Sequence, residues 1–342
     1  MTIYVDPPYA AYYKNKLFDS NDSVLNRDDI LAPFVRLLTD CNERSLCIKT
    51  ADYLHESAEK NEACDYYSFG LLDNLEKIAC KKNVRLKAFV IFEPPLVAPK
   101  LYKNLAKLTR LFEAVYVHNV IGDAYSLDGV DTRRLKKLYW PQPYSQVIDI
   151  YWNKVDRKRR VVVINGNHKP NTYNRELYSK RIEVMMQLAS FDFVDLYGRG
   201  WSDWLSRKSL WLPYWRNRGK LLSIYHGVCP SKHEVLSQYD FCLCFENMQM
   251  KGYVTEKIFD CLYAGTVPIY LGADDIGDLL PSEVFIDFRR FKTISELKKH
   301  LVSLSQPEIN AYKLAGRAFL QSVQGLKYYN FMNEIIMLQH RS

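Results

Sequence analysis

Several side chains suited to binding a phosphorylated ligand lie within twelve residues of one another. They are Glu246, Asn247, Tyr253, Glu256 and Lys257. Thr255 stands where a helix N-cap belongs, and the free N–H groups and partial positive charge of a helix N-terminus attract phosphate. Lys257 adds a full positive charge, and a carboxylate beside it can accept hydrogen bonds from sugar hydroxyls. The Thr-Glu-Lys sequence alone also fits an ordinary capped helix. The flanking sequence is therefore needed to distinguish a ligand site from a helix cap.

The flanking residues predict a strand, loop, helix and strand in succession. Phe241–Phe245 is an uncharged apolar strand, and a polar turn follows at 247–252. Apolar residues then recur at helical spacing, and Gly265 ends the helix as a C′ residue would. These apolar residues are Ile258, Phe259, Leu262 and Tyr263. Val267–Leu271 is a second buried strand, closed by Gly272. Such units build parallel sheets, whose ligand sites lie at the strand ends.

The same stretch resembles a known signature. Phe-Glu-Asn at 245–247, Tyr-Val-Thr-Glu-Lys-Ile at 253–258 and Val-Pro-Ile at 267–269 are similar to the pattern of glycosyltransferase family 10, the α1,3/4-fucosyltransferases. The resemblance implies that Lys257 holds the pyrophosphate of a GDP-sugar. It also implies that Glu246, Asn247, Tyr253 and Glu256 shape the nucleotide and fucose pocket.

A second match precedes this stretch. Arg181 begins an Arg-x-x-x-Met-x-x-Leu segment in a helix expected over 176–188, ahead of Val-Asp-Leu-Tyr-Gly at 194–198. In the family the corresponding arginine grips the donor's phosphates, and a planar guanidinium suits this bidentate task. Arg175 is the competing candidate, and an exposed helix arginine with no ligand is the plain alternative.

Glu93 follows the buried strand predicted over 85–92, at the edge of a parallel sheet where ligands bind. A solvated strand end is the structural alternative. The resemblance places the family's general base in a similar segment, and a carboxylate can take the proton of an attacking hydroxyl. Asp52 and Asp123 are rivals near other strand ends, and His118 is either a polar site residue or a structural one.

The rest of the chain predicts two α/β domains. Strands expected at 3–5, 45–49 and 115–118 alternate with helices at 30–38 and 71–81, and the Pro-containing segment 139–144 leads to a strand at 161–165. The resemblance implies two Rossmann-like domains facing across a cleft, the GT-B fold. Residues 1–150 would bind the acceptor, and residues 151–342 the GDP-sugar donor. A helical tail within 309–339 would pack back on the first domain.

Composition narrows the function classes. The apolar fraction of 48% supplies two cores, and the net charge of +8 comes with no recognisable nucleic-acid module. Arg157–Arg160 is either a solvated linker or strand edge, or a segment attracted to anionic lipid headgroups or to the negatively charged donor. The Trp- and Arg-rich segment 202–230 is expected to be an insertion or long loop. The eight cysteines lack metal or disulfide spacing, which favours a reducing cytosol.

The resemblance therefore implies an inverting, metal-independent transferase that needs no cofactor. Asp-x-Asp is absent from the sequence, and Lys257, Arg181 and a helix N-terminus would stabilise the leaving diphosphate instead of a metal. L-fucose would pass from GDP-fucose to a glycan, free or lipid-linked, such as the 3-OH of GlcNAc or glucose in a bacterial O-antigen. Another GDP-linked deoxy or amino-deoxy hexose, or a non-catalytic sugar-binding role, are the alternatives. With no leader or membrane span recognised, we expect a cytoplasmic protein, with peripheral contact at the inner membrane as an option.

Overall fold

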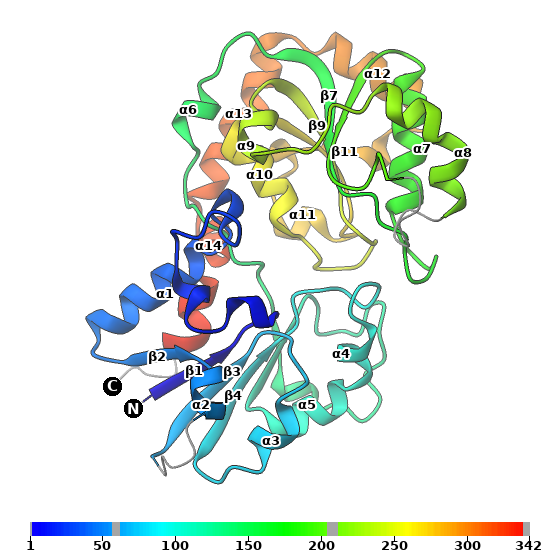
Figure 1. Ribbon diagram of the computed structural model, residues 1–342. Coiled ribbons are helices and arrows are strands. Elements are labelled where there is room, and N and C mark those ends of the chain that lie inside the picture. Colours follow the sequence, from blue (N-terminus) through cyan, green and yellow to red (C-terminus); the bar gives the residue numbers. More distant parts are fainter. Residues whose placement is uncertain (1, 57–61, 204–210, 338–342) are drawn as a thin grey trace. The chain divides into compact units, whose positions relative to one another are not determined.

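Two compact units make up this computed structural model, which describes residues 2–56, 62–203 and 211–337 (Figure 1). Unit 1 contains the chain up to Pro143 together with the segment from Lys327 onward, and unit 2 contains Tyr144–Leu326. Each unit is built on its own parallel β-sheet. Alternating strands and helices, the pattern found in the sequence, produce this architecture.

Unit 1 holds a six-stranded sheet in the order β2-β1-β3-β4-β5-β6. Its strands are β1 (Thr2–Asp6), β2 (Cys47–Thr50), β3 (Cys64–Ser68), β4 (Val84–Val90), β5 (Ala114–Val117) and β6 (Leu135–Lys137). Its helices are α1 (Ala32–Glu43), α2 (Asp52–Glu56), α3 (Leu75–Ala79), α4 (Pro99–Lys103), α5 (Leu105–Leu111) and most of α14 (Val323–Met337). The order reverses between β1 and β3, and β4 ends three residues before Glu93.

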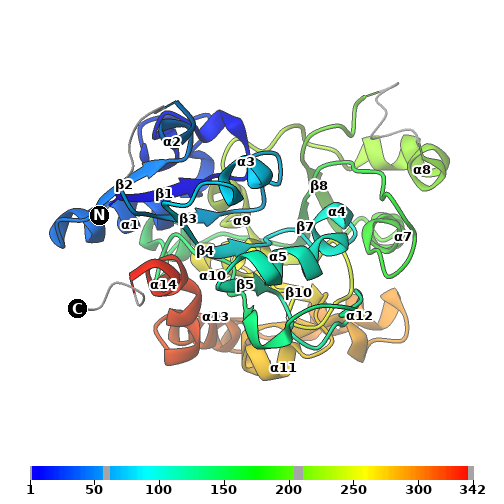
Figure 2. The same cartoon turned by 90° about the horizontal axis from the view of Figure 1, so that it is seen from below.

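Helices cover both faces of this sheet. Side chains from α1 and α14 form one buried cluster with β1, β3 and β4. Side chains from α2, α3, α4 and α5 form a second cluster on the other face. Figure 2 shows α14 and α3 on opposite sides of β3 and β4. The two clusters are the paired cores that a doubly covered parallel sheet requires.

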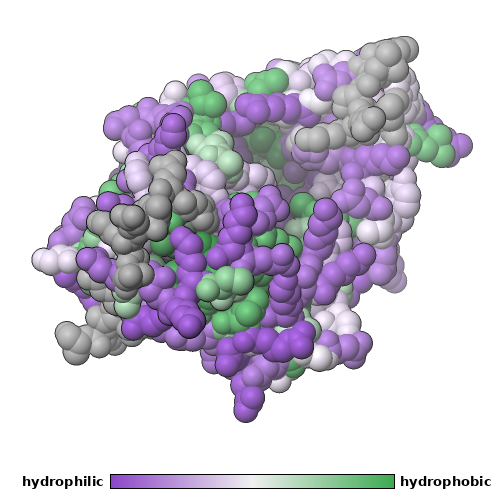
Figure 3. All heavy atoms as spheres, turned by 60° about the horizontal axis from the view of Figure 1, so that its bottom comes forward, coloured by the Kyte–Doolittle hydropathy of each residue, from purple (hydrophilic) through white to green (hydrophobic). Residues whose placement is uncertain are grey.

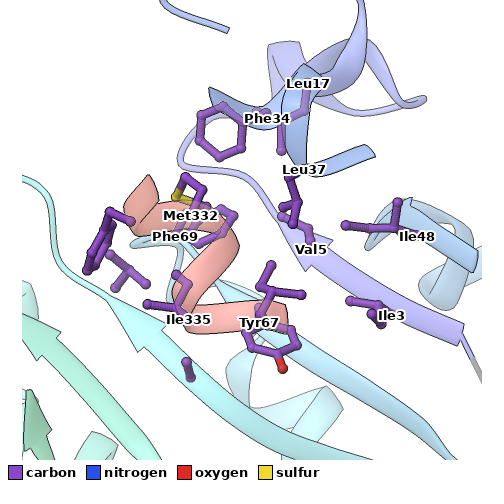
Figure 4. Packing of buried hydrophobic residues seen from close by; sticks show 14 of the residues in the cluster. Ile3, Val5, Leu17, Phe34, Leu37, Ile48, Tyr67, Phe69, Met332 and Ile335 are labelled. Carbon is purple, nitrogen blue, oxygen red and sulfur yellow. The ribbon is translucent and has the colours of Figure 1, made fainter. Parts of the chain in front are cut away.

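The last helix returns to the first unit, which confirms the expected packing of the C-terminal tail. Met332 and Ile335 of α14 point into the cluster that contains Phe69, Val5 and Leu37 (Figure 4). Arg36 of α1 fixes the return. Its guanidinium donates to the carbonyl oxygens of Pro143 (2.7 Å), Gln142 (2.8 Å) and Tyr329 (2.9 Å).

Unit 2 holds a five-stranded sheet in the order β11-β10-β9-β7-β8. Its strands are β7 (Lys158–Ile164), β8 (Val194–Tyr197), β9 (Tyr239–Phe245), β10 (Val267–Leu271) and β11 (Ile286–Asp287). Its helices are α6 (Asp149–Trp152), α7 (Tyr178–Ala189), α8 (Leu212–Ser223), α9 (Lys232–Leu236), α10 (Glu256–Ala264), α11 (Ile276–Leu279), α12 (Ile294–Ser303) and α13 (Gln306–Leu320). The order reverses between β7 and β9, so ligands are expected at the carboxyl ends of these two strands.

Several elements were not expected from the sequence, and β3 and α8 are two of them. β3 escaped prediction because Asp65 interrupts its apolar pattern. In the fold Asp65 is buried and paired with Arg85 of β4 at 2.6 Å. The segment 202–230 contains α8 rather than only a loop, although residues 204–210 lie outside the described residues. Helix α8 buries Tyr214 and Leu221, one narrow face that leaves little periodicity to detect.

The basic run 157–160 includes the first three residues of β7, 158–160, and has partners within the fold. Arg157 donates to the carbonyl oxygens of Tyr151 (2.7 Å) and Ala264 (2.8 Å), and burial lowers the pKa of its guanidinium to about 10. Arg160 pairs with Asp192 and Asp195, each at 3.0 Å. These arginines tie the start of β7 to its neighbours.

Across the described ranges, no helix combines the length and apolarity needed to cross a membrane. On the face shown in Figure 3, hydrophilic residues predominate and hydrophobic ones form small patches.

The packing of α14 predicts a large effect of truncating one of its core side chains. Ile335→Ala should lower the free energy of unfolding by about 2–5 kcal/mol, because a buried aliphatic side chain is lost and a cavity remains. Leu314→Ala, at a residue of α13 that is 56% exposed, is the matched control and should change the free energy of unfolding by under about 0.5 kcal/mol. Urea denaturation measures both. Equal, small effects would contradict a core role for α14.

Candidate functional site

The predicted strand, loop and helix at the centre of unit 2 are present. Every residue of β9 and β10 is buried, and the two strands pair in parallel from Val267 opposite Phe241 to Leu271 opposite Phe245. Helix α10 begins at Glu256, and Gly265 ends it in the left-handed conformation at φ 68°. The loop between β9 and α10 therefore leaves the sheet at the carboxyl edge, beside the point where the strand order reverses.

The side chain of Glu246, the first residue after β9, is completely buried. Its carboxylate accepts hydrogen bonds from the Thr255 N–H (2.8 Å) and the Thr255 hydroxyl (2.9 Å). The Lys257 ammonium lies 3.0 Å from Oε2. A buried charge is tolerated only when it is paired and hydrogen-bonded, and this carboxylate meets both conditions. It thereby ties the end of β9 to the start of α10.

Thr255 has the extended backbone expected of an N-cap, but its side chain has a different task. Its hydroxyl bonds to Glu246 and also accepts from the Lys257 ammonium at 2.9 Å. A charged carboxylate is a stronger hydrogen-bond partner than a main-chain amide. This explains why the Thr255 hydroxyl binds Glu246 instead of capping the helix.

The start of α10 carries two charged side chains, Glu256 and Lys257. Burial opposes the charge of Lys257, but Glu246 and then Glu256 outweigh it and raise the pKa of the ammonium above its ordinary value. Burial likewise opposes the charge of Glu256, and Lys257 and then Lys232 outweigh it, so that the pKa of this carboxyl is lowered. Both groups are ionised at neutral pH. An ammonium and a carboxylate at a helix N-terminus can bind a phosphate and a sugar hydroxyl side by side.

Arg181 of α7 lies behind this loop with 2% of its surface exposed. Its Nη2 donates to the main-chain oxygens of Phe245 (2.8 Å) and Glu246 (3.0 Å). Burial lowers the pKa of the guanidinium from a very high starting value, so the group remains charged. The structure thus joins Arg181 to Glu246 through the main chain.

Asn247 and Tyr253 lie in the same loop. The carbonyl oxygen of Asn247 accepts from the N–H of Leu177 (3.0 Å), just before α7. Tyr253 is buried, and its carbonyl oxygen accepts from the Tyr270 hydroxyl at 3.3 Å. Gly272 leaves room for the loop, since a Cβ there would stand 2.6 Å from Cγ of Glu246.

The competing arginine takes a different position. Arg175 adopts a left-handed backbone at φ 57°, and its guanidinium pairs with Asp274 at 3.4 Å. The main-chain oxygen of Arg175 accepts from the N–H of Gln249 at 2.8 Å. Arg175 therefore contacts the loop at Gln249, whereas Arg181 contacts it at Phe245 and Glu246.

Two charged residues next to the site, Lys232 and Asp260, were not predicted from the sequence. Asp260 of α10 is almost fully buried, and its Oδ2 lies 2.8 Å from the Lys232 ammonium at the start of α9. Burial disfavours its charge, but Lys232 and His233 outweigh it and lower the pKa of Asp260 to about 2. An acidic residue inside an otherwise apolar helix pattern was the available signal, because such a residue needs a partner.

Glu93, the remaining predicted site residue, belongs to unit 1. It is half-buried just beyond β4, and its main-chain oxygen accepts from the Tyr102 hydroxyl at 3.1 Å. His118 is buried, with Nε2 2.6 Å from the carbonyl oxygen of Phe92. His118 thus holds the main chain of Phe92, the residue before Glu93. Of the rival acids, Asp52 accepts from the N–H of Lys14 at 3.0 Å, while Asp123 follows β5 in the chain.

In the described part of the chain, no cluster of three or more His, Cys, Asp or Glu side chains is arranged to hold a metal ion. The eight cysteines include Cys242, Cys244 and Cys261, which are buried and free. Burial raises the pKa of Cys261 above its ordinary value, which marks it as an unreactive thiol.

Comparison with known proteins singles out the same half of the chain. Residues 155–313 match the model of the C-terminal domain of glycosyltransferase family 10 (fucosyltransferase). An α-(1,3)-fucosyltransferase of Helicobacter pylori is 42% identical over 82 residues, which cover 24% of this chain and 17% of that protein. The matched part is thus under a fifth of that relative's length.

Solved structures extend the likeness to the whole fold. A crystal structure of an α1,3-fucosyltransferase is 17% identical, with a TM-score of 0.53, and the match covers 98% of this chain and 90% of that one. A crystal structure of an α1,3-fucosyltransferase with GDP gives a TM-score of 0.50 at 16% identity, over the same shares of the two chains. This likeness confirms the expected fold class, GT-B with two α/β domains.

The buried carboxylate predicts a stability effect. Glu246→Gln should lower the free energy of unfolding by about 2–4 kcal/mol, because Lys257 and Thr255 lose their charged partner. Glu256→Gln is the matched control. Its carboxylate is 30% exposed and 3.7 Å from Lys257, so the loss should stay under about 1 kcal/mol. Urea denaturation of the two variants measures the difference. A loss for Glu246→Gln no larger than that for Glu256→Gln would show that the buried pair does not hold the loop.

Proposed function

Since residues 155–313 match the model of the C-terminal domain of glycosyltransferase family 10 (fucosyltransferase), we propose that the protein transfers L-fucose from GDP-fucose to a hydroxyl of a glycan. The observation that carries the proposal is the start of α10. There the Lys257 ammonium is fixed by Glu246 and Thr255 at a helix N-terminus, within the matched residues. This arrangement suits a nucleoside diphosphate.

The proposed donor site divides its work among the residues of unit 2. Lys257 neutralises the diphosphate, and Glu256 accepts hydrogen bonds from the sugar. Glu246 is completely buried, so it acts through Lys257 rather than by touching the donor. Asn247 and Tyr253 shape the loop over which nucleotide and fucose would lie.

Arg181 has a supporting role in this proposal. It holds two carbonyl groups of the loop, and within the described residues its Nε is buried without a hydrogen-bond partner. Its charge adds to the positive potential behind the diphosphate. A buried guanidinium with a donor left over is consistent with a ligand that completes the site.

Glu93 is the proposed base. Its carboxylate takes the proton of the acceptor hydroxyl as that oxygen attacks the anomeric carbon. The bond from this carbon to the diphosphate oxygen breaks, and GDP leaves with the electron pair. Attack opposite to the leaving group inverts the anomeric configuration. The acceptor would be a glycan ending in GlcNAc or glucose, as in a bacterial surface polysaccharide.

Calorimetric titration tests the donor site. We expect wild type to bind GDP and GDP-fucose in preference to UDP-GlcNAc. Lys257→Met should weaken GDP binding about 10- to 100-fold, since charged hydrogen bonds to the diphosphate are lost. Lys299→Met, which removes an exposed lysine of α12, is the control and should bind normally. Equal binding of UDP-GlcNAc would overturn the proposal, and tighter binding of GDP-mannose would favour another GDP-hexose.

Transfer assays test the base. With GDP-fucose and a panel of glycans ending in GlcNAc or glucose, Glu93→Gln should lower the rate of transfer by about 10²- to 10⁴-fold. GDP affinity should stay unchanged, because the donor residues belong to unit 2. Asp52→Asn and Asp123→Asn are the comparison variants and should stay within a few-fold of wild type. Loss of transfer in either of them, with an active Glu93→Gln enzyme, would move the base to that residue.

A further inference from the structure

Helices α9 and α10 are in contact (Figure 1), and their charged side chains include Lys232 of α9, and Glu256 and Asp260 of α10. Glu256 and Asp260 are four residues apart, so they project from one helix face with Cβ atoms about 5–6 Å apart. Lys232 places its ammonium 2.8 Å from Oδ2 of Asp260. Lys232 also acts electrostatically on Glu256, because burial opposes the charge of that carboxyl, and Lys257 and then Lys232 outweigh burial and lower its pKa.

Asp260 is a rigid anchor for Lys232. Its side chain is only 9% exposed, and its Oδ1 lies 3.2 Å from Nε2 of the buried His233. Aromatic rings enclose this histidine, with centroids 5.9–6.3 Å from its own; they belong to Tyr144, Tyr151 and Tyr263. A well-packed apolar residue in place of a buried ion pair is often as stable or more so. Stability alone therefore does not explain why position 260 is an aspartate. We take this as a sign that Lys232, the cation bound to Asp260, has a function.

Glu256 needs such a cation. Lys257 is 3.7 Å from Glu256 but 3.0 Å from Glu246, so its ammonium is mainly engaged by the buried carboxylate. Without Lys232, Glu256 would share one ammonium with Glu246 and stand beside the negative charge of Asp260. Like charges at this spacing repel, and the Glu256 side chain would turn away.

We propose that Lys232, anchored by Asp260, is a positioning residue that orients the Glu256 carboxylate toward a hydroxyl group of the donor sugar. The inference rests on the proposed function, in which Glu256 binds the sugar and Lys257 the diphosphate. It assigns the two lysines different parts of one ligand. Lys257 governs affinity for GDP, and Lys232 governs the additional affinity that the sugar contributes.

Titration with GDP and with GDP-fucose separates these effects. Lys232→Met keeps the aliphatic stem and removes the charge, and it should weaken binding of GDP-fucose about 10-fold more than binding of GDP, the size of one charged hydrogen bond. Lys232→Arg keeps the charge and should restore most of the sugar-dependent affinity. In a Glu256→Gln background, Lys232→Met should leave the ratio of the two affinities unchanged, because the residue it acts through is gone.

Thermal unfolding of each variant shows that it is folded, and Lys299→Met serves as the neutral control. If Lys232→Met, with Glu256 in place, weakens binding of GDP and of GDP-fucose equally, the inference is overturned. Failure of wild type to bind GDP would overturn the proposed function and this inference with it. Normal GDP binding with an unchanged ratio in Lys232→Met would overturn the inference alone.

Discussion

The buried carboxylate of Glu246 is the constraint around which the candidate site is arranged. A negative charge removed from water costs several kcal/mol unless it finds charged and hydrogen-bonding partners. Thr255 and Lys257 supply these partners, and they lie nine and eleven residues further along the chain. The intervening loop must therefore close on itself. The start of α10 is fixed against the end of β9 before any ligand arrives.

The other charges of unit 2 follow the same rule. Arg181 is held by main-chain oxygens of the loop, and Lys232 by Asp260. Each cation near the helix start thus has a protein anion or dipole that holds it in place. A site of this kind spends little free energy on reorganisation when a negatively charged ligand binds. Gly272 contributes to this arrangement, because a larger residue at this position would displace the Glu246 carboxylate from its buried position.

Local patterns predicted the elements of the site, and tertiary partnerships did not follow from them. The strand over 241–245, the helix near Glu256 and its glycine end could be predicted because apolar spacing and capping residues are local signals. The strand β3 could not, since Asp65 is acceptable there only with Arg85 from a neighbouring strand. The inward direction of Glu246 and the link between Lys232 and Asp260 likewise depend on residues brought together by folding. The family resemblance singled out residues of this loop and of α10, but it did not reveal their contacts.

The return of α14 to unit 1 has a consequence for how the chain acquires its structure. Unit 2 is one continuous segment, whereas the core of unit 1 needs residues from both ends of the described chain. During synthesis the sheet of unit 1 emerges first but lacks one of its covering helices until the residues of α14 have left the ribosome. Unit 2 can close before that point. Of the two units, unit 1 is therefore the one that is synthesised first and completes its fold last.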